Sequence, residues 1–187
     1  MFEFPKIYSF PPFYTKQQNA TILQNQLDAW TELILQFCQY YNIYSLLCHG
    51  NILTQQDPST EVPPLFQNKQ LERAVLDEFL NDIFNHMIHK LARAEYVDPK
   101  KRDSGILIYW QTPAEWAKLL YEYVDRTGQL GTVLTVYELT QLDELPQSEP
   151  LKGIDSNLFE KVVDVLVKQG KAQVLRANGG IEGVKIV

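Results

Sequence analysis

Large apolar side chains recur with helical spacing in the first quarter of the chain. Between residues 23 and 41 they follow one another at alternating steps of four and three: Leu23, Leu27, Trp30, Ile34, Phe37 and Tyr41. This spacing matches the 3.6-residue period of an α-helix and predicts a helix with one buried face. Thr21 and Gln24 have the spacing of a capping box, so we expect the helix to begin there.

A second helical pattern covers residues 69–92, where apolar side chains recur every four residues from Val75 to Leu91. The pattern predicts a helix, or a short helix followed by a longer one. A short β-rich run at 44–48 and a polar, proline-containing loop at 49–66 precede it.

Two further β-rich runs follow, at residues 94–97 and 106–110. Residues 99–105 between them begin with proline, end with glycine and are charged, which indicates a hairpin turn.

A second series of predicted elements begins at Thr112. Thr112, Pro113 and Glu115 suit the N-cap, the first and the third positions of a new helix, and Gly128 suits its end. This local chemistry predicts a helix between residues 113 and 127.

The rest of the second half repeats the earlier order of elements. A strand is expected at 132–136, with a short helix from Tyr137, followed by an acidic loop at 141–153. A helix capped by Asp155 or Ser156 should extend to about Gln169. A closing hairpin turns at Asn178-Gly179, a dipeptide typical of such turns.

The order helix, strand, helix, helix, strand, turn, strand therefore occurs twice, over residues 20–110 and 112–187. It is the order of a winged helix. We predict an α+β protein with two tandem winged-helix domains, 19–111 and 112–187. An N-terminal arm, residues 1–18, precedes them.

The arm alternates prolines with aromatic residues. Because proline restricts itself and its predecessor, we expect an extended, polyproline-like segment and not a helix. Exposed aromatic side chains favour docking, either on a partner or on the chain's own domain. Pro11 to Tyr14 also fits the PPxY pattern that WW domains bind, so a WW-domain ligand is one alternative. Pro5 and Tyr8 frame a degraded copy in which Lys6 replaces the second proline.

Charge argues against nucleic acid as a partner. The 187 residues carry 17 Lys and Arg against 23 Asp and Glu, a net charge of −6. Nonspecific nucleic-acid binding depends on an excess of basic residues. The helix that would enter the major groove is acidic in its first half, at Asp77, Glu78 and Asp82, and the only basic cluster is 100–102 in the first wing. A DNA-binding winged-helix transcription factor stays as an alternative.

No catalytic, cofactor or metal site is expected. No nucleotide-binding or nucleophile motif occurs, and Cys38 and Cys48 are expected to be reduced thiols. His86 and His89 lie one turn apart without a third ligand of fixed spacing, so we expect exposed helix histidines. No apolar run approaches the ~20 residues of a membrane-spanning helix, and no secretory signal is visible.

Three segments resemble one known family. The arm sequence YSFPPFYT at 8–15 resembles the start of the small-subunit family of the ESCRT-II endosomal sorting complex. EWAKLLY at 115–121 is similar to that family's Trp-containing helix, and Gly128-Gln129 and Tyr137-Glu138-Leu139 are similar to the signatures after it. Thr127 and Val136 depart from the usual Ser and Leu.

The resemblance implies an adaptor without enzymatic activity in multivesicular-body sorting of ubiquitinated membrane proteins. It implies a cytoplasmic protein recruited peripherally to endosomes, without inserting into the membrane, and two copies in each complex. The second domain is implied to recruit an ESCRT-III subunit that nucleates filaments. The arm is implied to bind the two larger ESCRT-II subunits, and the expected partner-binding residues are Pro5, Tyr8, Phe10, Pro11, Pro12, Phe13 and Tyr14.

Overall fold

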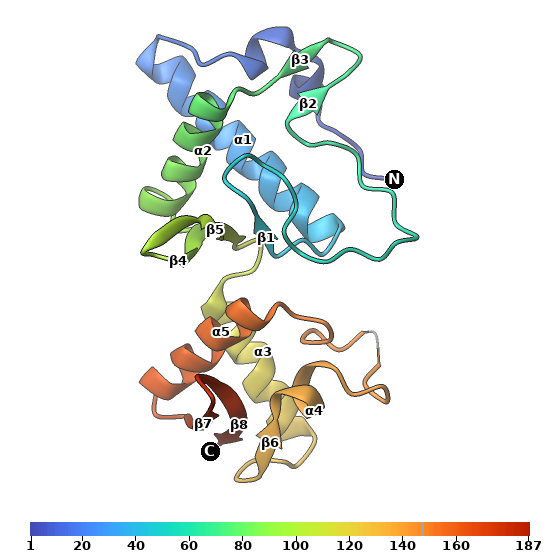
Figure 1. The fold of residues 1–187 in the computed structure, drawn as a ribbon, viewed down its shortest axis with the longest axis vertical. Helices are drawn as coiled ribbons and strands as arrows, with labels where there is room; N and C mark the ends of the chain where they lie inside the picture. The colour runs from blue at the N-terminus through green and yellow to red at the C-terminus, as the bar shows by residue number, and fades with distance from the viewer. Residues whose placement is uncertain (147) are drawn as a thin grey trace. The chain divides into compact units, whose positions relative to one another are not determined.

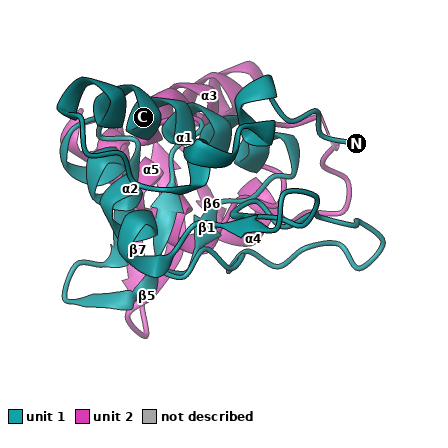
Figure 2. Ribbon diagram, turned by 90° about the horizontal axis from the view of Figure 1, so that it is seen from above, with its two compact units in different colours: residues 1–110 teal, residues 111–187 magenta. Residues whose placement is uncertain are grey.

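The chain folds into two compact units, residues 1–110 and 111–187, which Figure 2 shows in two colours. The computed structural model describes residues 1–146 and 148–187. Both units combine helices with a small antiparallel sheet, so the α+β class expected from the sequence is confirmed. Each unit is described by itself.

Unit 1 begins with the arm and ends with a hairpin (Figure 1). Its elements are the 3₁₀ turns η1 (Lys6–Ser9) and η2 (Pro11–Tyr14), α1 (Ala20–Tyr40), β1 (Ser45–Leu46), β2 (Gln67–Asn68), β3 (Arg73–Ala74), α2 (Asp77–His89), β4 (Ala94–Asp98) and β5 (Lys101–Ile108). The main sheet has the order β1-β5-β4, and β2 and β3 form a separate two-stranded hairpin.

Helix α1 forms where the apolar stripe predicts it, but its start differs. Asn19 is the N-cap, and its side chain accepts a hydrogen bond from the amide of Ile22 at 3.0 Å. The predicted capping box at Thr21 and Gln24 is therefore wrong, because Asn19 already provides the acceptor and Thr21 lies inside the first turn.

The helical prediction is also wrong for the segment before Asp77. Asn68 Oδ1 accepts hydrogen bonds from the amides of Gln70 at 3.1 Å and Leu71 at 3.2 Å, and Glu72 has a φ of 53°. A side chain bonded to the following amides and a left-handed residue make a turn and exclude a helix. Unit 1, all of which is described, therefore has one helix fewer than the expected order.

The charged segment between the two β-rich runs of unit 1 is mostly strand. Strand β5 begins at Lys101, which pairs with Asp98, so only Pro99 and Lys100 form the turn. The ladder carries an irregularity between Tyr96 and Asp98. The turn predicted over 99–105 is thus shorter than expected.

Unit 2 has the element order predicted from the sequence. It contains α3 (Pro113–Arg126), β6 (Val133–Thr135), α4 (Val136–Thr140), α5 (Ser156–Lys168), β7 (Ala172–Ala177) and β8 (Gly180–Ile186). The capping box of Thr112 and Glu115 is confirmed, and Asp155 caps α5. Gln147, in the predicted acidic loop, lies outside the described residues.

The sheet of unit 2 has the order β6-β8-β7, and α3 and α5 pack against each other. The buried core includes Trp116, Leu120, Phe159, Val162 and Val184. In the described residues of both units, no helix combines the length and the apolar character that crossing a bilayer requires.

Candidate docking site on the N-terminal arm

The arm is folded into two short turns, so the expected extended conformation is wrong. The amide of Tyr8 donates to the carbonyl oxygen of Pro5 at 2.9 Å, and the amide of Phe13 donates to that of Phe10 at 3.0 Å. Pro5 and Phe10 stay extended and begin the turns. The fixed φ of proline is compatible with the start of a 3₁₀ turn. The restriction that proline places on the backbone therefore allows this conformation.

Two side chains of α1 hold the arm by its backbone. Trp30 Nε1 donates to the carbonyl oxygen of Phe13 at 2.9 Å. Gln26 Nε2 donates to the same oxygen at 3.0 Å and to that of Thr15 at 2.8 Å. The arm makes no β-ladder, so these side chains take the place of the missing backbone partners.

The β2–β3 hairpin and the segment just before it also bind the arm. Asn68 Nδ2 donates to the carbonyl oxygen of Tyr8 at 3.0 Å, and the hydroxyl of Tyr14 donates to the same oxygen at 2.7 Å. The hydroxyl of Tyr8 lies 3.1 Å from the carbonyl oxygen of Pro64, to which it donates. Burial raises the pKa of both phenols, with the proximity of Tyr14 adding to the effect at Tyr8. Both hydroxyls therefore act as neutral donors at physiological pH.

Aromatic stacking completes the attachment. The ring of Phe13 lies parallel to the indole of Trp30, with centroids 4.2 Å apart and planes 3° apart. Tyr14 meets the same indole edge-on at 5.6 Å. Near the N-terminus, Phe2 makes an edge contact with Phe37 at 5.3 Å. Apart from Phe10, the aromatic residues of the arm thus belong to the core of unit 1 or pack against it.

The seven expected partner-binding residues fall into two groups. Tyr8, Phe13 and Tyr14 are buried in unit 1, and Phe13 and Tyr14 are only 2% and 3% exposed. The remaining four are exposed on the arm's outer face: Pro5, Phe10, Pro11 and Pro12. Phe10 is 57% exposed.

Docking of the arm on its own domain, the alternative that the sequence left open, is what the structure shows. Because Tyr14 is buried, the folded chain does not offer a PPxY tyrosine to a WW domain. Gln26 and Asn68, which bind the arm, are functional residues that the sequence pattern did not predict. No local signal marks them, since their partners lie 11 to 60 residues away in the chain.

Helix α2 is acidic at its start, with Asp77 and Glu78 in the first turn. His86 on this helix is buried, and its Nε2 donates to Asp28 Oδ1 of α1 at 2.8 Å. The expectation of an exposed His86 is therefore wrong. This hydrogen bond lowers the pKa of Asp28. Among the described residues, no three His, Cys, Asp or Glu side chains form a group that could hold a metal ion.

Unit 2 exposes apolar side chains on the outer face of its sheet. Val133 on β6 is 49% exposed and Leu175 on β7 is 55% exposed. Gly183 on β8 lies between them. A Cβ at this glycine would lie 3.0 Å from Val133 and 3.8 Å from Leu175, so the two side chains converge over the glycine. We call Val133, Leu175 and Gly183 the sheet patch.

A two-unit α+β chain with an apolar arm face and an apolar sheet patch has the features of a subunit that contacts other proteins. The family model described as "ESCRT-II complex subunit" matches residues 7–155. The chain belongs to this family.

Relatives match almost end to end. The vacuolar protein-sorting-associated protein 25 of Danio rerio is 34% identical over 98% of both chains. The human protein of the same name is 34% identical, over 98% of this chain and 97% of its own. Against the crystal structure of subunit VPS25 of ESCRT-II, the TM-score is 0.84 at 26% identity, covering 97% of this chain and 98% of that one. A chain from a crystal structure of the VPS22/VPS25/VPS36 complex matches in fold, with a TM-score of 0.80 at 24% identity over 98% of both chains.

Proposed function

We propose that this chain is a non-enzymatic adaptor subunit of ESCRT-II in multivesicular-body sorting of ubiquitinated membrane proteins. Its arm (1–18) and two winged-helix modules (19–111 and 112–187) would serve protein contacts. The single observation that carries the proposal is the match to the VPS25 proteins along 98% of the chain. The protein would work in the cytoplasm, recruited peripherally to endosomes, with two copies in each complex.

The partners of the arm would be the two larger ESCRT-II subunits. This is supported by the solved complex in which a relative of this chain is assembled with VPS22 and VPS36. In the proposed contact the arm stays folded. Phe10, Pro11 and Pro12, with Pro5 beside them, face the partner. The buried set of Tyr8, Phe13 and Tyr14 holds that face in position, so little ordering entropy is lost on binding.

Replacing Phe10 by alanine tests the arm contact. Co-expressed with the two larger subunits, the variant should assemble at least ~30-fold more weakly if Phe10 is a central anchor, since such anchors contribute 2 kcal/mol or more. Leu76→Ala is the matched control, because Leu76 is an exposed apolar residue of the same unit that is not part of the arm. Mass measurement of the recovered complex is the assay. Equal assembly of both variants would contradict the proposed contact.

The second module would recruit the ESCRT-III subunit that nucleates filaments, and we propose the sheet patch as its surface. The support is the exposure of Val133 on β6 and Leu175 on β7. These strands lie on either side of β8, which carries Gly183. A shallow apolar surface with a small residue at its centre suits a partner side chain that lies across the strands.

Leu175→Asp tests this surface, because a carboxylate there would face an apolar partner without a counter-charge. Val167→Asp is the control, since Val167 is an exposed valine on α5. Titration calorimetry with the purified ESCRT-III subunit should show loss of binding for Leu175→Asp alone. If both variants bind like the unmodified protein, another face of the module is used.

A further inference from the structure

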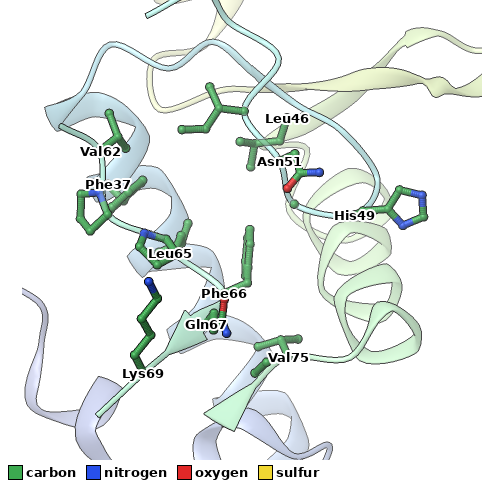
Figure 3. Close-up of a pocket in the computed structure, with 15 residues that line it drawn as sticks. Phe37, Leu46, His49, Asn51, Val62, Leu65, Phe66, Gln67, Lys69 and Val75 are labelled. Carbon is green, nitrogen blue, oxygen red and sulfur yellow. The ribbon is translucent and has the colours of Figure 1, made fainter. Parts of the chain in front are cut away.

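Unit 1 contains a cavity of about 680 Å³ that is separate from the outer face of the arm (Figure 3). Its floor consists of buried apolar side chains: Phe37, Leu46, Leu65, Phe66 and Val75. Its rim carries polar groups of Asn51 and Gln67. The volume lies within the roughly 300–1,000 Å³ of typical ligand pockets, and an apolar floor with a few polar rim groups is their usual composition.

The walls of this cavity are held in place without a ligand. The amide of Val75 donates to the carbonyl oxygen of Phe66 at 2.9 Å, and the amide of Leu47 donates to that of Asn51 at 2.7 Å. The hydroxyl of Tyr8 lies within hydrogen-bonding distance of the carbonyl oxygens of Pro64 and Gln67, and so holds the backbone of the wall at 64–67. A preformed cavity binds a ligand at a lower entropic cost than one that must first form.

Gly50 determines the shape of one wall. It has a φ of +85°, and a Cβ at this position would lie 2.5 Å from the ring of Phe66. The absence of a side chain lets Phe66 close the wall while the turn at 47–50 stays tight. The loop at 49–66 that forms much of the cavity is almost without regular structure, and loops of this length in compact domains are commonly functional.

The charge of the lining differs from that of the whole chain. The lining residues include one lysine and one histidine, and none of them is Asp or Glu, although the chain has a net charge of −6. His49 Nδ1 is bonded to Asp77 Oδ2 at 3.1 Å, so this ring nitrogen already has a carboxylate partner. Lys69 makes no ion pair with any carboxylate among residues 1–146 and 148–187. In Figure 3 its amine extends from the β2–β3 hairpin toward the wall near Leu65.

We propose that this cavity binds a peptide segment of a protein partner that presents a large apolar side chain next to a carboxylate. The side chain fills the space above Phe37 and Phe66. The carboxylate pairs with the ammonium of Lys69. The side-chain amides of Asn51 and Gln67 form hydrogen bonds with the peptide backbone. The cavity is thus a second docking site, distinct from the outer face of the arm and from the sheet patch.

Two small probes of opposite charge test the proposal on the full chain. 4-Phenylbutyrate and 4-phenylbutylamine share a phenyl ring on a four-carbon chain, whose last carbon is a carboxylate in one and carries an amine in the other. In amide NMR spectra, 4-phenylbutyrate should shift Gly50, Asn51 and Gln67 saturably. The dissociation constant should be about 1–5 mM, as expected for ~12 heavy atoms. The amine should bind about 2–5-fold more weakly, which is the effect of one exposed charge pair.

Lys69→Glu should reverse this preference, so that the amine binds more tightly than the carboxylate. Lys90→Glu is the control, since Lys90 is an exposed lysine at the end of α2 outside the lining, and it should leave both affinities unchanged. Circular dichroism verifies that both variants are folded. Unsaturable shifts, equal affinity for the two probes, or an unchanged preference in Lys69→Glu would each overturn the proposal.

Discussion

Replacing Phe13 by alanine should destabilise unit 1, although the residue lies in an N-terminal arm. The side chain is 2% exposed, and its ring is stacked on Trp30 at 4.2 Å. Truncating a buried phenylalanine costs about 3–5 kcal/mol, which includes the lost stacking. We expect about 3 kcal/mol, since a segment near the chain end can partly collapse into the space. At about 4 °C per kcal/mol for a domain of this size, the melting temperature should fall by roughly 12 °C.

Thermal and urea unfolding, followed by circular dichroism and tryptophan fluorescence, measure this effect. Phe10→Ala is the matched control, because it removes the same ring from an exposed position of the same arm. The control should change the free energy of unfolding by less than about 0.5 kcal/mol. A Phe13→Ala protein that melts within 2 °C of the unmodified chain, a margin of about 0.5 kcal/mol, would show that the arm is not part of the core.

Other predictions follow from individual contacts. Asn68→Ala should cost about 1–3 kcal/mol in urea unfolding, because it removes two hydrogen bonds to buried arm groups and leaves the amides of Gln70 and Leu71 without their acceptor. The pKa of Asp28 is lowered in the folded state by its bond to His86, so Asp28 stabilises the fold above the pKa of the unfolded carboxyl, about 3.9. This stabilisation disappears as the pH falls through the lower folded pKa. The stability difference between the unmodified protein and Asp28→Asn should therefore shrink between about pH 5 and pH 2, and a constant difference would contradict the assignment. The pKa of the Cys38 thiol is raised by complete burial, so a thiol reagent should modify only the partly exposed Cys48 in the native protein. Equal labelling rates would contradict that burial.

The elements that the sequence predicted well are those controlled by neighbouring residues. Thr112 and Glu115 bond to each other's backbone, so their spacing alone identified the start of α3. For α5 the sequence allowed Asp155 or Ser156 as the cap, and Asp155 is the residue that accepts the hydrogen bond from the Leu158 amide. Asn178-Gly179 placed the last turn, because both residues adopt the positive φ that a tight hairpin requires.

The elements that the sequence misplaced depend on distant contacts. The apolar spacing continues smoothly through Val75 into α2, yet the segment before it is a hairpin because Asn68 bonds to the next amides and to the arm. His86 was expected to be exposed because its partner, Asp28, is 58 residues away. The conformation of the arm was misjudged for the same reason, since proline rules describe a chain in solvent and not one stacked on Trp30.

The sequence placed the candidate docking site on the arm, which stays a prediction, but it did not separate the buried residues of the arm from the exposed ones. The sequence identified the arm and its prolines, whereas alternation of proline and aromatic residues does not say which rings face inward. That distinction depends on Gln26 and Trp30, whose hydrogen bonds to the arm turn Phe13 inward and leave Phe10 on the surface.

The way the arm is held also affects how the protein is made. Ribosomes synthesise the arm before Trp30 and Asn68, which bind it. At ~5–20 residues per second, the 54 residues between Tyr14 and Asn68 take roughly 3–11 s to synthesise. During this interval the aromatic side chains of the nascent arm lack their final binding site. The arm therefore cannot make all its native contacts until residue 68 has been synthesised.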